Sequence, residues 1–151
     1  MSGAYAEQYV AHTLGVLGTE VKVHVKHDLK SGSYTFTDLV ITGLKEPVIL
    51  GRGKGMSAPK GGSIAIEIKN GKASYLKQQK DHMVIQAEGH QNADASITIC
   101  TRDIKDLSPE EEAALREALQ NAGSPLIGML PRKDETDAML WKAVKGGNDA
   151  G

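Results

Sequence analysis

The chain has too little cysteine to be held together by disulfide bonds. Its 151 residues include one cysteine, Cys100, which cannot form a bridge within the chain. The five histidines have no matching cysteines, which excludes a structural zinc site of the finger type. We therefore expect a domain that is stabilised by its hydrophobic core and acts in a reducing compartment, the cytoplasm.

Long apolar runs are also missing. No stretch reaches the roughly 20 apolar residues that a membrane-spanning helix needs. The N-terminus lacks the basic and then apolar pattern of a signal peptide. The glycine-rich segment GRGKGMSAPKGG (51–62) contains no Gly-Lys followed by Ser or Thr, so it does not match an ATP-binding loop. We expect no membrane segment and no ATP site of this kind.

Charge is present in balance but is unevenly distributed along the chain. Residues 1–80 carry eleven Lys and Arg against six Asp and Glu, a net charge of +5. Residues 81–151 carry seven against thirteen, a net charge of −6, and the two sum to the overall −1. A basic segment attracts polyanions, so an anionic partner is expected at the first half of the chain. There, Arg52, Lys54 and Lys60 of the glycine-rich loop are candidates for binding phosphates.

The pattern of apolar residues predicts one α/β domain over 1–151. Helical spacing and capping signals predict helices over 4–17, 73–88, 108–123 and 136–144. Period-two alternation predicts strands over 20–26, 34–42, 64–69 and 95–101. This order predicts a three-layer α/β/α sandwich around a mixed central sheet, with a C-terminal helical extension over 108–145.

An acidic residue two positions before a lysine occurs at four places. These are Glu20–Lys22, Asp28–Lys30, Glu67–Lys69 and Asp103–Lys105. Only Glu67 and Lys69 are centred in a strand, IAIEIK, whose other face is three isoleucines. Alternation puts both charged side chains on one face, ~7 Å apart along the strand. If that face lines a cleft, the pair is a metal ligand with a cation beside it; if it faces solvent, the strand is an ordinary amphipathic one.

Asp38 favours the cleft. It lies in YTFTDLVIT, where aspartate is a poor strand former and where a carboxylate is costly unless it is paired or metal-bound. Together with Glu67 it offers the oxygen ligands that Mg²⁺ prefers, and Lys69 could orient a water or stabilise charge on phosphorus. These three residues predict hydrolysis of a phosphodiester. We assign no role to His24 or His27, because lone histidines are usually structural or exposed.

This pattern resembles the PD-(D/E)XK nuclease superfamily, the restriction-endonuclease-like fold. That family has a helix-strand-strand-strand-helix-strand core, with an aspartate late in the second strand and an acidic-x-lysine in the third. Thr37-Asp38 stands where the family has Pro-Asp, and Glu67-Ile68-Lys69 stands for the acidic-x-lysine. The missing proline is a departure from the family pattern.

The opening SGAYAEQYVAHTLGVLG is similar to the first helix of resolvase-like members of that family. The resemblance covers about residues 3–102 and implies that Glu7 is a third acidic group near the metal. The helix after the lysine strand often supplies a glutamine toward the nucleic acid, which implies Gln78 or Gln79.

The resemblance implies a metal-dependent endonuclease with Glu7, Asp38, Glu67 and Lys69 as catalytic residues. The first three would bind a divalent metal, Mg²⁺ ahead of Mn²⁺ or Zn²⁺, and DNA ranks ahead of RNA as substrate. A compact nuclease with no DNA-reading module looks like the toxin domain of a bacterial competition system, such as contact-dependent inhibition or a type VI effector. Such a domain would be delivered into a target cell and would have a cognate immunity protein.

Three other functions are compatible with the sequence. The same fold could carry an RNase, perhaps acting on tRNA. The basic half could bind nucleic acid without cleaving it. The acidic second half, especially 106–117, could serve as a protein-interaction surface.

Overall fold

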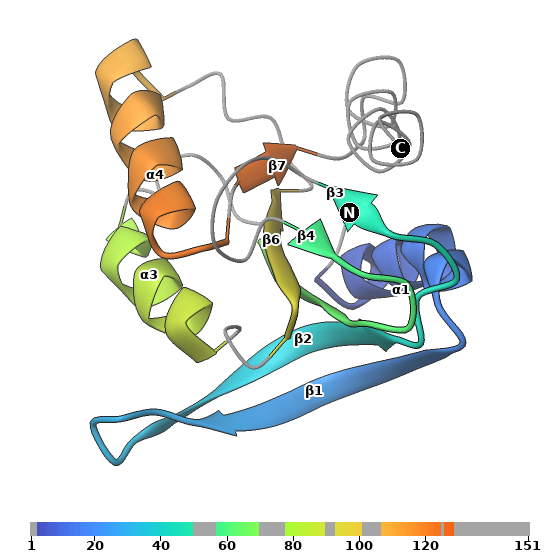
Figure 1. Ribbon diagram of the computed structural model, residues 1–151. Helices are drawn as coiled ribbons and strands as arrows, with labels where there is room; N and C mark the ends of the chain where they lie inside the picture. The colour runs from blue at the N-terminus through green and yellow to red at the C-terminus, as the bar shows by residue number, and fades with distance from the viewer. Residues whose placement is uncertain are drawn as a thin grey trace.

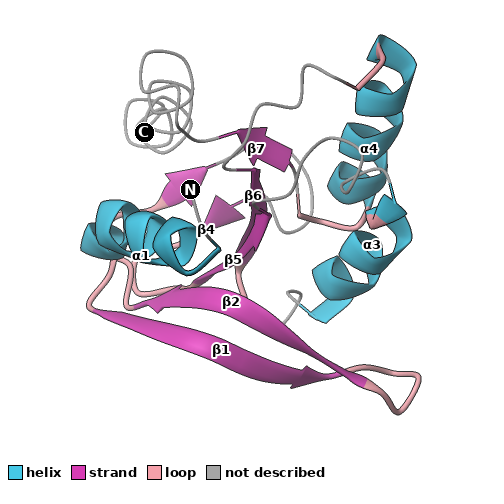
Figure 2. Ribbon diagram, turned by 180° about the vertical axis from the view of Figure 1, so that it is seen from behind, coloured by secondary structure: helices cyan, strands magenta, loops and turns pink. Residues whose placement is uncertain are grey.

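The protein folds as a mixed α/β structure around one five-stranded sheet. The computed structural model describes residues 3–49, 57–69, 78–89, 93–100, 107–124 and 126–128. The strand order in the sheet is β1-β2-β5-β6-β7 (Figure 1). Helix α1 (Gly3–Leu14) lies on one face of the sheet, and α3 (Lys80–Gly89) and α4 (Pro109–Asn121) lie on the other (Figure 2). The expectation of an α/β fold with a mixed sheet is confirmed.

The sheet is antiparallel at one side and parallel at the other. Strands β1 (Glu20–Asp28) and β2 (Tyr34–Thr42) form a long antiparallel hairpin, and β2 also pairs antiparallel with β5 (Ile64–Lys69). Strand β5 pairs in parallel with β6 (Ala95–Cys100), which pairs in parallel with β7 (Leu126–Gly128). A strand with neighbours on both sides and helices over both faces is buried throughout, and every residue of β5 is buried.

Several element boundaries differ from the sequence predictions. The first helix ends at Leu14 and continues as a 3₁₀ turn, Gly15–Leu17. Part of the predicted glycine-rich loop is a strand, because β4 (Ser57–Ala58) pairs with β3 (Val48–Ile49). Strand β7 was not expected at all. The predicted helix over 136–144 lies outside the described residues, and no helix within the described ranges is long and apolar enough to cross a membrane.

The hydrophobic core lies between α1 and the sheet. Ile64, Ile66 and Ile68 of β5 are in register with Ala95, Ile97 and Ile99 of β6. Helix α1 packs onto this face with residues spaced along one side: Ala6, Val10 and Leu14. Complete burial of a leucine contributes about 1.5–3 kcal/mol relative to exposure, so this face anchors α1. The isoleucine face of β5 is therefore the core face, as its alternation predicted.

The turn from α1 into β1 depends on a glycine. A Cβ at Gly18 would collide with the carbonyl oxygen of Thr42 and would lie 2.6 Å from Cγ2 of Ile41. The next residue, Thr19, donates its N–H to that same carbonyl at 3.0 Å. Only glycine lets the chain approach β2 this closely, which fixes the position of α1 on the sheet.

On the other face, α4 begins with the predicted capping box. Ser108 Oγ accepts the N–H of Glu111 at 3.1 Å, and Glu111 Oε1 accepts the N–H of Ser108 at 3.0 Å. Just beyond the end of the helix, buried Ser124 accepts a hydrogen bond from Ser96 of β6 at 2.8 Å. These contacts hold α4 against the parallel half of the sheet.

Candidate functional site

The ladder between β2 and β5 stops at the acidic residues that the sequence singled out. Its last pair is Leu39 with Ile66. Continuing the antiparallel register would put Asp38 opposite Glu67. Instead of a further backbone hydrogen bond between the strands, the N–H of Ile68 donates to Oδ2 of Asp38 at 2.8 Å. A side chain thus replaces a backbone acceptor, and two carboxyl groups meet where the strands stop pairing.

Asp38 and Glu67 lie close enough for each to affect the pKa of the other. Burial, and then the negative charge of Glu67, raise the pKa of Asp38 to about 7. Burial also raises the pKa of Glu67, although its contacts with Asp38 and Lys69 act in the opposite direction. Two neighbouring buried carboxyl groups favour the binding of a proton, or of a cation in its place, because a second negative charge there is costly. The pair is therefore suited to binding a cation.

Two donors position the Glu67 carboxylate. Lys69 Nζ lies 3.6 Å from Glu67 Oε1, and the two side chains are only 10% and 5% exposed. Gln86 on α3 donates its Nε2–H to the same oxygen at 3.3 Å. A buried ion pair loses hydration, and further hydrogen bonds offset part of that loss. The charged face of β5 therefore does not face solvent; it is buried under α3.

Glu7 lies beside Asp38 and comes from α1, on the opposite face of the sheet from α3 (Figure 2). A carboxylate oxygen of this half-buried side chain lies within 4.8 Å of one of Asp38, and its Oε2 lies 3.4 Å from Nε2 of His24 on β1. Burial, and then the charge of Asp38, raise the pKa of Glu7, whereas the contact with His24 lowers it. The structure thus brings Glu7, Asp38, Glu67 and Lys69 together, although they come from three elements spread over more than sixty residues.

Glu7, His24 and Asp38 form a cluster that could hold a metal ion. One ligand atom from each lies within 4.8 Å of the others. Ligands that bind one ion at 2.0–2.6 Å lie at most about 4–5 Å apart, so the spacing fits. Carboxylate oxygens suit Mg²⁺ and Mn²⁺, while the imidazole nitrogen also suits Mn²⁺ and Zn²⁺.

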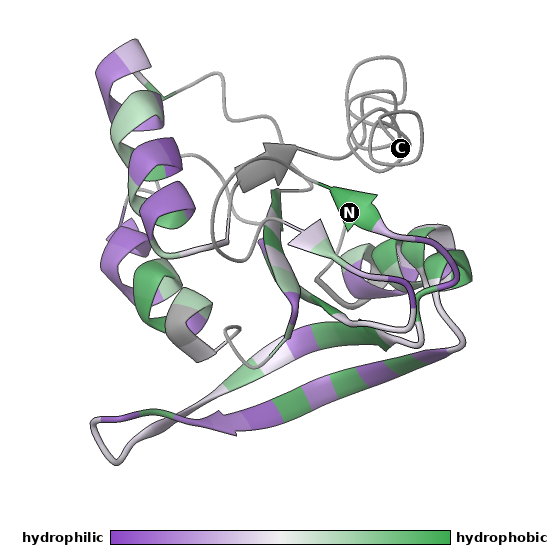
Figure 3. Ribbon diagram, in the orientation of Figure 1, coloured by the Kyte–Doolittle hydropathy of each residue, from purple (hydrophilic) through white to green (hydrophobic). Residues whose placement is uncertain are grey.

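His24 was not predicted from the sequence, yet it lies opposite Asp38. The register pairs Val23 with Leu39 and Val25 with Thr37, which leaves His24 and Asp38 facing each other between them. The sequence alone could not show that His24 lies beside Asp38, because the turn HDLKSGS does not define how the two strands align. Hydrophobic and hydrophilic residues alternate along β1 (Figure 3), and its register with β2 places His24 beside Asp38.

The backbone of His24 is also unusual. Its φ of 48° is the one positive value among the non-glycine residues of the described chain. A left-handed residue inside a strand costs roughly 1–2 kcal/mol. The pairs on either side keep the same register, so no extra residue has been inserted there. Such a conformation persists only where its surroundings impose it, and it is found often at functional sites.

The remaining predicted residues lie away from the cluster or outside the described ranges. Gln78 is exposed and Gln79 half-buried at the start of α3, where the carbonyl of Gln79 accepts the N–H of Met83. The glutamine that hydrogen-bonds Glu67 is instead Gln86, two turns further along the helix. Lys60 is exposed in the turn before β5. Arg52 and Lys54 lie outside the described residues.

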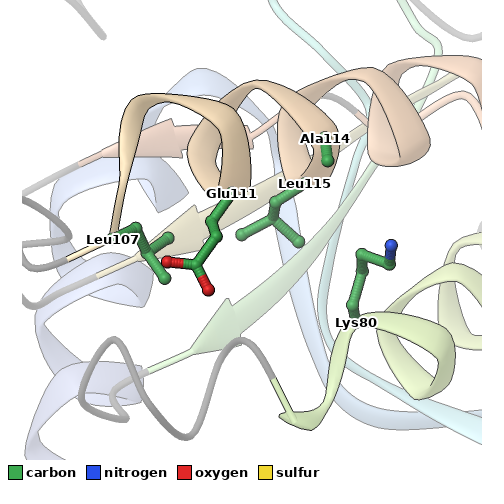
Figure 4. Close-up of a pocket in the computed structure, with 5 residues that line it drawn as sticks. All are labelled: Lys80, Leu107, Glu111, Ala114 and Leu115. Atoms are coloured by element: carbon green, nitrogen blue, oxygen red, sulfur yellow. The ribbon is translucent and has the colours of Figure 1, made fainter.

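A pocket elsewhere in the molecule does not share these residues. It measures about 250 Å³, and its lining comes from the start of α3, from α4 and from the residue before it: Lys80, Leu107, Glu111, Ala114 and Leu115 (Figure 4). Its acidic residue is already engaged in the cap of α4. The candidate site is therefore the acidic cluster between β1, β2, β5 and α1.

Comparison with protein-family models, curated proteins and solved structures found no match to this chain.

Proposed function

We propose that this protein is a metal-dependent nuclease that hydrolyses phosphodiester bonds, in DNA ahead of RNA. The observation that carries the proposal is the meeting of Asp38, Glu67 and Lys69 where β2 and β5 stop pairing, with Glu7 reaching them from α1. Acidic ligands with a lysine beside them suit the attack of a water on a phosphate. The acids can hold a metal ion that activates the water, and the lysine can stabilise negative charge on the phosphate.

The order of elements supports a restriction-endonuclease-like arrangement. The described elements α1, β1, β2, β5, α3 and β6 follow the helix-strand-strand-strand-helix-strand order of the PD-(D/E)XK superfamily. The small hairpin β3–β4 falls between the second and third strands of that core. The acidic-x-lysine lies on the third strand and the aspartate on the second, as in that family.

Each residue would have a distinct role. A bound divalent cation would activate a water and neutralise charge on the phosphate. Glu7, His24 and Asp38, whose ligand atoms lie together, would hold that cation, and Glu67 would join them from its place beside Asp38. Lys69, held in place by Glu67, would orient the attacking water or stabilise the charge that develops on phosphorus. Gln86 would keep the Glu67 carboxylate in position.

A cleavage assay tests the proposal. Supercoiled plasmid and total tRNA are each incubated with the purified protein in Mg²⁺, in Mn²⁺ and in EDTA. We expect metal-dependent cleavage that Glu67→Gln abolishes. Glu20→Gln is the matched control, because Glu20 opens another acidic-x-lysine but lies exposed at the start of β1. Binding without cleavage under every condition would instead indicate a domain that only binds nucleic acid. No interaction with either polymer would favour a protein-interaction domain that uses the acidic second half of the chain.

The same proposal extends to a role as the toxin domain of an interbacterial competition system, with a cognate immunity protein. The sequence supports this through a compact catalytic unit that has no recognisable DNA-reading motif. Induced expression of the chain in the bacterial cytoplasm should stop growth and degrade nucleic acid, and Glu67→Gln should relieve both effects. Normal growth with an active wild-type nuclease would exclude the toxin role while leaving the activity intact.

A further inference from the structure

The β1–β2 hairpin extends past the rest of the sheet and carries exposed aromatic rings. Strand β2 pairs with β5 only through Leu39–Ile41, so its first residues have β1 as their one sheet neighbour among the described strands (Figure 1). Tyr34 is 56% exposed and Phe36, the one phenylalanine of the chain, is 47% exposed. Exposed rings at neighbouring positions form an apolar surface, which often marks a binding site.

These rings and one lysine form a compact group, which we name the aromatic platform: Lys26, Tyr34 and Phe36. The two rings pack edge to face with their centroids 5.6 Å apart. Lys26 Nζ lies 4.5 Å from the centroid of Tyr34, and Lys26 is the register partner of Phe36. The platform therefore offers flat apolar surface and a positive charge at one place.

The two rings of the aromatic platform lie on the same strand as Asp38. Tyr34 and Phe36 are exposed and alternate with buried Thr35 and Thr37, so the two rings point to one side of the strand. Two rises put Phe36 about 7 Å from Asp38 along the strand, and four put Tyr34 about 14 Å away. Asp28, opposite Tyr34, marks the far end, where a carboxylate would repel phosphates. Along β2 the platform therefore lies between the hairpin tip and Asp38.

We propose that the aromatic platform binds the unpaired bases of single-stranded nucleic acid next to the bond that is cut. Bases of a single strand expose their π-faces and stack on aromatic side chains, whereas bases in a duplex are already stacked on one another. Lys26 would pair with a phosphate between the stacked bases. This inference rests on the proposed function, and it names single-stranded segments as the substrate class.

Binding is measured with the metal-free protein in EDTA, so that no cleavage is needed. The probes are a fluorescent oligodeoxynucleotide of about a dozen nucleotides, matching the range of single-strand site sizes, the duplex of the same sequence, and the corresponding RNA. We expect the single strands to bind at least tenfold more tightly than the duplex. The DNA and RNA arms show which sugar the site prefers.

Substitutions on the platform test its role. Phe36→Ala and Tyr34→Ala should each weaken single-strand binding by roughly tenfold, in line with the loss of one stacked base. Phe36→Leu should also weaken it, because leucine keeps apolar area but not the flat ring, whereas Phe36→Trp should retain binding. Val23→Ala removes an exposed apolar residue from the register position opposite buried Leu39 and should leave binding unchanged.

The proposal fails if single strand and duplex bind equally, or if Phe36→Leu binds as well as wild type. A loss in Val23→Ala as large as in Phe36→Ala would also overturn it, since any exposed apolar residue would then act alike. Thermal melts of each variant identify those that do not fold. Asp38→Asn separates this inference from the proposed function: cleavage should disappear while preference for the single strand remains. Cleavage by wild type without single-strand preference would overturn this inference alone.

Discussion

Oδ2 of Asp38 accepts the backbone N–H of Ile68 at 2.8 Å. This bond stands in place of the next backbone hydrogen bond between β2 and β5. This contact has two consequences. It ends the pairing of the strands beside Glu67, and it keeps the Asp38 carboxyl group among buried neighbours. Because burial and the charge of Glu67 raise the pKa of Asp38, we expect the stability of the protein to depend on pH and on metal.

Without metal, the protein should lose stability as the pH rises from 5 to 8. The folded-state pKa of Asp38 is raised from 3.8 to about 7, so the folded state binds more protons than the unfolded chain between those values. Stability from this group is therefore full below pH 4 and is lost as the pH passes through 7. Urea unfolding in EDTA at pH 5 and pH 8 measures the change. Asp38→Asn should show a smaller decrease, and an equal decrease in the variant would contradict this origin.

A divalent cation should reverse that loss, most strongly at high pH. A cation must displace the proton that Asp38 holds, so metal affinity should fall as the pH drops below about 7. At a hundred times its Kd, the metal would add about 2.7 kcal/mol to the free energy of unfolding. Thermal melts with Mn²⁺ at pH 5.5 and pH 8 give the comparison. A rise in Tm that is the same at both pH values would show that the metal does not bind at Asp38.

His24→Ala should weaken Mn²⁺ and Zn²⁺ binding by roughly tenfold or more, with a smaller effect on Mg²⁺. Imidazole nitrogen favours the transition metals over Mg²⁺, which prefers oxygen ligands. Isothermal titration of each metal into the protein measures the three affinities. His12→Ala is the control, since His12 is exposed on α1 and is not part of the metal cluster. Equal losses for all three metals would mean that His24 acts on the fold rather than as a ligand.

Replacing His24 with glycine and with alanine should separate its backbone from its side chain. Both variants lose the imidazole, but only glycine adopts a φ of 48° without cost. We expect His24→Gly to be more stable than His24→Ala by about 1 kcal/mol, the typical cost of a left-handed residue. Chemical denaturation in EDTA measures the difference. A more stable alanine variant would show that the left-handed conformation is not retained.

Lys69→Gln should lower the rate of cleavage by about 10²–10³-fold at saturating metal, the usual effect of removing one group that stabilises the transition state. Lys69→Arg keeps the charge and should retain part of the activity. Because Lys69 Nζ also pairs with buried Glu67, both variants need a thermal melt to show that they fold. Single-turnover cleavage rates with normal substrate binding would assign the loss to the chemical step. A Lys69 variant that cleaves at the wild-type rate would show that Lys69 has no role in catalysis.

Local pattern was enough to predict most elements around the site. Strand β5 has the predicted bounds, because glycines and Asn-Gly enclose three alternating isoleucines. The capping box of α4 forms as predicted, since its hydrogen bonds join residues three apart. Strand β7 was missed because LIG is short and is a strand only through pairing with β6. Short strands without their partners carry little signal.

The sequence by itself determined which residues carry charge into an apolar strand, because alternation and composition are local properties. It therefore identified Asp38, Glu67 and Lys69. Only the tertiary structure decided which other groups would join them. His24 depends on the alignment of β1 with β2, and Gln86 on how α3 packs over β5, two relationships between distant segments. Such packing follows from the burial of the whole core, which no short stretch of sequence encodes.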